Sequence, residues 1–187
     1  SGSMHSPVTG TRKGATTHVR CIDVAALVAA SVLRKNPSAG VLPFSDDVVA
    51  TELNPRDSVM TNAQRLAALP SGGTNCSAPL RWLNERGERG SLVILVSDNQ
   101  SWMDTRRGVG PTQTLIEWER FKRTNPNARL VCLDLQPITN SQAIDREDIL
   151  NVGGFSDAVF ETIAAFTAGS LGPHSQRWID EIRRVAV

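Results

Sequence analysis

The sequence predicts an α/β fold in which a doubly wound, mostly parallel sheet is flanked by helices. Segments with strand character alternate with segments of helical pattern along the chain. The clearest strand is "SLVILVSDN" at 91–99, where the continuous apolar run from Leu92 to Val96 indicates burial on both faces, as in a central parallel strand. A chain of 187 residues favours one domain with a substantial core.

The first third of the chain combines a loop, a helix and a hairpin. Residues 4–19 are rich in Ser, Thr, Gly and Pro and are expected to form a loop. The segment from Cys21 to Pro37 is Ala-rich and apolar nearly all round, which predicts a helix buried on most of its circumference and ended by Pro37. The apolar stretches 39–44 and 48–53, separated by a short polar turn, predict a hairpin.

Helices and strands continue to alternate after the hairpin. The expected helices cover 62–70, 77–87, 112–126 and the part of 151–169 that begins near Asp157. The expected strands are 91–99 and 128–135. We assign residues 1–171 to one domain and residues 172–187 to an amphipathic C-terminal tail with the apolar side chains Trp178, Ile182 and Val185.

One expected element is missing. A doubly wound sheet normally starts with a strand at its centre, ahead of the first helix. This sequence opens on a loop, so the central first strand is absent from the chain. We expect that the sheet either lacks this strand or receives it from residues outside the sequence.

Composition excludes several classes of function. The net charge of +1 gives no overall field that would gather nucleic acid or an anionic membrane. The three cysteines are odd in number and lack metal-finger spacing, which favours a reducing, cytoplasmic location. No apolar run approaches the roughly 18 residues that span a bilayer, so no membrane association is expected.

Three polar loops should meet at the carboxyl ends of the strands, where ligands bind in such sheets. They are "SGSM" at 1–4, "SGGTNCS" at 71–77 and "SDNQSW" at 97–102. Hydroxyl groups and a carboxylate without His or Cys are the ligands that Mg²⁺ or Mn²⁺ prefers. The predicted metal ligands are Ser1, Ser3, Thr74 and Asp98.

Each of these residues also has a simpler interpretation. The "SGSM" stretch could be a cloning remnant before Met4, or Ser1 could be a nucleophile activated by its own amine. Thr74 could cap the following helix, a role for which Asn75 and Ser77 compete. Asp98 could bind loop amides at the end of its strand.

Basic and aromatic residues beside the predicted site could contact a partner or RNA phosphate. A solvated loop is the favoured interpretation of the basic residues, and Trp102 could equally pack beneath its own loop. These candidate contacts are Arg12, Lys13, Arg20, Trp102, Arg106 and Arg107.

The combination of D-x-S-x-S, a loop threonine and an aspartate after a strand is the metal-ion-dependent adhesion site of von Willebrand factor type A domains, and this sequence resembles it. "SGSM" is similar to the end of that motif, with Thr74 and Asp98 as its other members. The stretches "LPSGGTNCSAPLRW", "VSDNQSW" and "ILNVGGFSDAVFETI" resemble the type A domain of the Ro autoantigen (TROVE) ribonucleoproteins, particularly bacterial ones. The resemblance covers nearly the whole chain.

The resemblance implies a role in RNA biology. Members of the family pair this domain with a ring of helical repeats that binds misfolded RNA ends and Y RNAs, and bacterial relatives act in RNA processing and decay with a nuclease. No such ring is present in this sequence. The leading aspartate of the motif and its strand are also absent, and a free amine at Ser1, with a pKa of roughly 8, would oppose cation binding.

We therefore expect a non-enzymatic module that binds Mg²⁺ (or Mn²⁺) and engages an Asp or Glu of a partner protein. Its companions would be the helical ring, in the same protein or in a companion chain, and non-coding RNA indirectly. The alternative is an enzyme, either a metal-dependent phosphohydrolase or an N-terminal serine hydrolase, although no general base or phosphate clamp accompanies Asp98. A third possibility is one piece of a split or cleaved protein.

Overall fold

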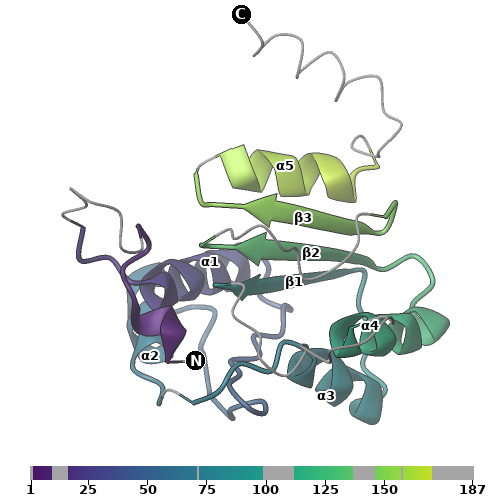
Figure 1. The fold of residues 1–187 in the computed structure, drawn as a ribbon, viewed down its shortest axis with the longest axis horizontal. Helices are drawn as coiled ribbons and strands as arrows, with labels where there is room; N and C mark the ends of the chain where they lie inside the picture. Colours follow the sequence, from purple (N-terminus) through teal and green to yellow (C-terminus); the bar gives the residue numbers. More distant parts are fainter. Residues whose placement is uncertain are drawn as a thin grey trace, which may run out of the picture.

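The computed structural model describes residues 2–9, 17–70, 72–98, 112–136, 146–156 and 158–169. Its sheet consists of the parallel strands β1 (Leu92–Ser97), β2 (Arg129–Asp134) and β3 (Ile149–Gly153), in the order β1-β2-β3 (Figure 1). Ser97 of β1 lies opposite Asp134 of β2 in the register. The predicted parallel α/β sheet is confirmed.

Helices cover both faces of this sheet. One face packs against α1 (Cys21–Lys35) and α5 (Ala158–Thr167), which share a core with β2. The other face packs against α3 (Ala78–Arg86) and α4 (Gln113–Thr124), whose Trp118 and Phe121 rings stack with centroids 5.7 Å apart.

The helix α2 (Val59–Ala67) and the short 3-10 helix η1 (Ser3–His5) pack against α1 and not, like the other helices, along a face of the sheet. Small side chains of α1 and α2 form a separate cluster of Ala26, Ala30, Ala63 and Leu66. Met4 of η1 is buried in the same core as α1. Both elements are therefore organised around α1.

Local signals set the helix boundaries. At the start of α2, the Ser58 hydroxyl accepts a hydrogen bond from the backbone N–H of Thr61. At the start of α4, the Thr112 hydroxyl accepts one from the backbone N–H of Leu115. Gly87 ends α3 with φ of +64°, a left-handed conformation that favours glycine. The helix expected over 62–70 thus begins earlier than predicted, because Ser58 caps it.

One sequence prediction about strands is wrong, and one strand has no counterpart in the prediction. The segments 39–44 and 48–53 form no regular hairpin: a single antiparallel bridge joins Phe44 and Val48. The strand β3 was not predicted, because its polar Asn151 and terminal Gly153 interrupt the apolar pattern. Its pairing with β2, which local sequence does not encode, holds it in the sheet.

The strand β1 also differs from expectation. Its side chains alternate between the two cores, so both faces are covered as predicted. However, Leu92, Val93, Ile94 and Val96 are only half-buried, because β1 lies at the edge of the described sheet and not at its centre.

The three cysteines, Cys21, Cys76 and Cys132, are buried and carry free thiols. Among the described residues, no helix combines the length and apolar character needed to cross a bilayer.

Candidate functional site

The candidate site lies where β1 and β2 end. Asp98 directly follows β1, and its residue is 0% exposed. Asp134 is the last residue of β2 and lies next to this position, since its register partner is Ser97. Because the two strands are parallel, both carboxylates lie at the carboxyl edge of the sheet, where ligands of such folds bind.

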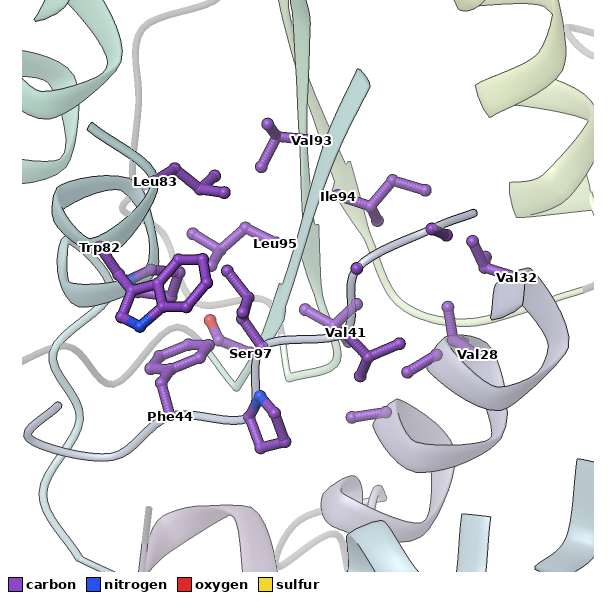
Figure 2. Close-up of a pocket in the computed structure, with 18 of the residues that line it drawn as sticks. Val28, Val32, Val41, Phe44, Trp82, Leu83, Val93, Ile94, Leu95 and Ser97 are labelled. Atoms are coloured by element: carbon purple, nitrogen blue, oxygen red, sulfur yellow. The ribbon is translucent and has the colours of Figure 1, made fainter. Parts of the chain in front are cut away.

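The N-terminal segment reaches the same edge. The backbone N–H of Gly2 donates to the carbonyl of Gly72 at 3.0 Å, which joins this segment to the loop before α3. Ser3 starts η1 and is half-buried, and the neighbouring Met4 anchors the helix in the core. Met4, Thr74 and Ser97 are among the residues that line one large cavity, part of which is shown in Figure 2.

Hydrogen bonds of Asn75 hold the loop that carries Thr74. Asn75 donates from its backbone N–H to the Ser45 carbonyl at 2.8 Å and from its amide to the Asp46 carbonyl at 3.1 Å. The Asn75 Oδ1 accepts from the N–H and hydroxyl of Ser77, the N-cap residue of α3. Ser77 is the N-cap residue of α3 but its side chain makes no capping hydrogen bond, and Thr74 is buried at 4% exposure.

Another segment packs directly on the backbone of this loop at Gly72. A Cβ on Gly72 would stand 3.0 Å from both Cβ and Oγ of Ser45, tighter than ordinary contact. The N–H of Gly73 donates to the Asp46 carboxylate at 3.1 Å. The turn at 45–47 thus fixes the backbone that presents Thr74.

Cys21, at the first turn of α1, faces the same carboxylates. Burial, and then the negative charge of Asp98, raises the pKa of its thiol to about 11, with a smaller contribution from Asp134. At neutral pH the thiol is protonated. Sequence reasoning missed both Cys21 and Asp134, although Asp134 could have been found by the same rule that identified Asp98, an acidic residue directly after a buried strand.

Arg20 forms an ion pair with Asp23 of the same chain. Its backbone N–H, Nε and Nη2 all donate to the Asp23 carboxylate, at 2.9, 3.0 and 2.7 Å. The hydrogen bonds from Arg20 lower the pKa of Asp23. Arg20 Nη1 lies 3.2 Å from His5 Nδ1, and since a guanidinium only donates, this histidine nitrogen accepts. Arg20 thus links η1 to the start of α1, and its contact with a partner or RNA stays a prediction.

The other predicted site residues fall outside the described residues. These are Ser1, Arg12, Lys13, Trp102, Arg106 and Arg107. Of the predicted ligands, the structure brings Ser3, Thr74 and Asp98 to one edge of the sheet, and metal binding by them stays a prediction. In the part of the chain that the structure describes, no cluster of three or more His, Cys, Asp or Glu side chains could hold a metal ion, so hydroxyl groups would have to contribute.

Comparison with known proteins identifies relatives in sequence and in fold. A family model described as the Ro60 vWA domain matches residues 1–167. The RNA-binding protein RO60 of Deinococcus radiodurans is 25% identical over 147 residues, which are 79% of this chain and 27% of that protein. The crystal structure of the D. radiodurans RO (RSR) protein superposes with a TM-score of 0.69 at 22% identity, over 88% of this chain and 32% of that one. The chain thus spans about a quarter of the length of its curated relative.

Proposed function

The chain belongs to the Ro60 vWA domain family, and on that premise we propose that it is a metal-dependent protein-binding module of an RNA-binding protein. In this proposal the module is not an enzyme. It holds one Mg²⁺ or Mn²⁺ ion and attaches a partner protein through an acidic side chain. The protein as a whole acts in the cytoplasm, in RNA processing or quality control.

The observation that supports the metal site is the burial of Asp98 at the carboxyl edge of the sheet, beside the loop of Thr74 and the segment of Ser3. Ligands of doubly wound sheets bind at this edge, beyond the carboxyl ends of the strands. The predicted ligands are all oxygens, the set that suits a hard divalent ion. Ser1, Ser3 and Thr74 would hold the ion directly, and Asp98 directly or through water.

The chain's own residues give this edge its binding character. Serine and threonine hydroxyls are neutral, so a bound ion would keep enough positive charge to accept a carboxylate from another protein. The Arg20–Asp23 pair and the Gly2–Gly72 hydrogen bond hold the Ser3 segment in place. The acidic partner would thereby be fixed in orientation as well as in position.

RNA binding belongs, in this proposal, to other parts of the full protein. The D. radiodurans relative is an RNA-binding protein about four times as long as the matched region. The net charge of +1 on the present chain supplies no general attraction for RNA phosphates. We therefore assign the module to protein contacts and a helical-repeat ring to RNA, with non-coding RNA reached indirectly.

The metal site is tested by titrating Mn²⁺ and following the free ion by electron paramagnetic resonance. The chain is extended by Asp-Gly before Ser1, which supplies a carboxylate and removes the ammonium group beside the ion. Thr74→Val and Asp98→Asn are each expected to weaken binding about tenfold or more. The matched substitutions Thr167→Val and Asp57→Asn, both away from the site, should leave the affinity unchanged.

The carboxylate-accepting role is tested on the same samples. Acetate, as a stand-in for a partner's acidic side chain, should displace metal-bound water and lower the proton relaxivity of the Mn²⁺ complex. No Mn²⁺ binding, or equal binding in all four variants, would contradict the metal site. Binding without any response to acetate would contradict the partner role alone.

A further inference from the structure

The helix α5 has an apolar outer face that the described residues leave exposed. Figure 1 shows α5 beside β3 at the outer end of the described fold. Its inner side chains are buried in the core shared with α1 and β2. On the outer face, exposed apolar residues follow one another at intervals of four, which places them in one row along the helix: Phe160, Ala164 and, just past the last turn, Ala168.

The composition of α5 is that of a helix covered on both sides. Glu161 is its only charged residue between Ala158 and Thr167. A helix that is apolar nearly all round is normally buried all round. Phe160 is nevertheless 39% exposed, although its ring meets that of Phe155 edge-on with the centroids 6.1 Å apart. The outer face therefore has the character of an interface, and its occupant has to be apolar.

The chain leaves α5 through a fixed, left-handed turn. Gly169 has φ of +77°, and its N–H donates to the Phe166 carbonyl at 3.0 Å. The Arg129 guanidinium lies 5.2 Å from the centroid of the Phe166 ring, and a Cβ on Gly169 would stand 3.4 Å from Arg129 Nη2. The segment after residue 169 thus starts beside the first residue of β2. From there it reaches the outer face of α5 by running back along it.

The amphipathic tail, residues 172–187, lies outside the described residues, and its sequence fits this face. Pro173 suits the first turn of a helix. The first and last members of its apolar row are eight residues apart, about 12 Å in a helix, as are Phe160 and Ala168. The spacing puts the following residues on one helical face: Trp178, Ile179, Ile182, Val185 and Ala186.

The two faces are complementary in size when the helices run antiparallel. Trp178, near the start of the tail, then lies at the end of α5 that carries Ala164 and Ala168, where small side chains leave room for a large ring. Val185, near the end of the tail, reaches Phe160. The connection between the two helices is about as long as those that join antiparallel helices elsewhere.

The charges agree with the same direction. Glu161 is exposed in the first half of α5, and α5 has no basic residue. In the antiparallel arrangement this half meets the second half of the tail, where Arg183 flanks the apolar row. A parallel arrangement would bring Trp178 against Phe160 and would require the connection to cross the whole length of α5 first.

We propose that the tail forms a helix that docks antiparallel on the outer face of α5, with Trp178 seated on Ala164 and Ala168. The occupant of this face is thus a segment of the same chain. The docked helix gives α5 an apolar partner on the side away from the sheet. This interface is separate from the candidate metal site, so it forms with or without a bound ion.

The test uses NMR of the full chain in EDTA, which removes any contribution of a metal. Nuclear Overhauser effects are expected between the Trp178 indole and the methyl groups of Ala164 and Ala168. Amide exchange at Ile179, Ile182 and Val185 should be about tenfold or more slower than in a free peptide of residues 172–187. Ala164→Glu should abolish both signals. Ile116→Glu is the matched control, because Ile116 is 46% exposed on α4, on the opposite face of the sheet, and both signals should persist.

A second variant probes the contact from the other side. Trp178→Ala leaves α5 intact and should return the tail amides to the exchange rates of the free peptide, while the amides of β2 keep their protection. The inference is overturned if the tail of the unmodified chain exchanges like the free peptide, or if Trp178 shows no contact with α5. It is also overturned if the contacts appear only between differently labelled chains in a mixed sample, since a second copy would then cover this face.

Discussion

The carboxylate of Asp148 organises a polar cluster at the end of the sheet opposite the candidate site. Its oxygens accept from Trp118 Nε1 at 3.0 Å and from Nε and Nη2 of Arg146 at 2.9 and 2.8 Å. Lys122 Nζ lies 3.6 Å away. These contacts join α4 to the start of β3, so we predict that Asp148→Asn destabilises the fold.

The expected loss is about 2 kcal/mol. Hydrogen bonds to a charged group contribute roughly 1.5–3 kcal/mol each, but an asparagine oxygen can still accept one of the three. The Asp148 side chain is 18% exposed, so the stability lost on its substitution should be smaller than the loss for a fully buried ion pair. Asp57→Asn is the matched control, because the Asp57 and Arg65 side chains are 28% and 50% exposed and such a pair contributes about 0.5 kcal/mol.

The effect should depend on pH in a defined direction. Burial alone would raise the pKa of Asp148, but hydrogen bonds from Arg146 and Trp118 and the nearby positive charges lower it below its ordinary value of 3.8. A carboxyl group with a lowered folded-state pKa contributes stability above its ordinary pKa and loses it as the pH falls through the folded value.

Urea unfolding at pH 7 and at stepwise lower pH measures this difference. The free-energy gap between the wild-type chain and Asp148→Asn should be about 2 kcal/mol at pH 7. It should narrow as the pH falls below 3.8. A gap that is the same at every pH, or no larger than that of Asp57→Asn at pH 7, would refute the role assigned to this cluster.

Two other predictions concern local structure. Gly87→Ala should lower the free energy of unfolding in urea by about 1 kcal/mol, because φ of +64° is strained for alanine, although a Cβ there would meet nothing within 4 Å. Gly40→Ala, at a position with equally open surroundings, is the control. Equal losses in the two variants would contradict the backbone argument. Cys21 should react with a thiol reagent at pH 8 far more slowly in the folded chain than in urea, because burial and Asp98 raise its pKa to about 11. Peptide mapping identifies the labelled cysteine, and equal labelling of Cys21 in both states would contradict that environment.

Helices were predictable from this sequence because their signals are local. Pro37, Thr112 and Gly87 mark helix ends by restricting or satisfying their own backbone, and α1, α4 and α5 follow the predicted ranges closely. Strands depend on partners that lie far away in sequence. The strand β3 was missed because its identity comes from pairing with β2, and 39–44 forms no regular strand because only Phe44 is paired, in a single bridge to Val48.

The candidate site was predictable in part for the same reason. Asp98 and Thr74 stand at strand and helix boundaries, positions that sequence periodicity locates, and the structure brings both to the edge expected for ligands. Cys21 and Asp134 join them only through the packing of α1 and the register of β2 on β1. The rule of an acidic residue after a buried strand would have identified Asp134, but no local pattern identifies Cys21.

The most direct test of the proposed metal module is a crystal structure of the Asp-Gly-extended chain grown with Mn²⁺ and measured at a wavelength where manganese scatters anomalously. The account predicts one strong anomalous peak within about 2.5 Å of the Ser3 and Thr74 hydroxyl oxygens, with Asp98 bound directly or through one water. A strong peak elsewhere, such as beside Asp23 or Asp148, or no peak at saturating Mn²⁺, would contradict it.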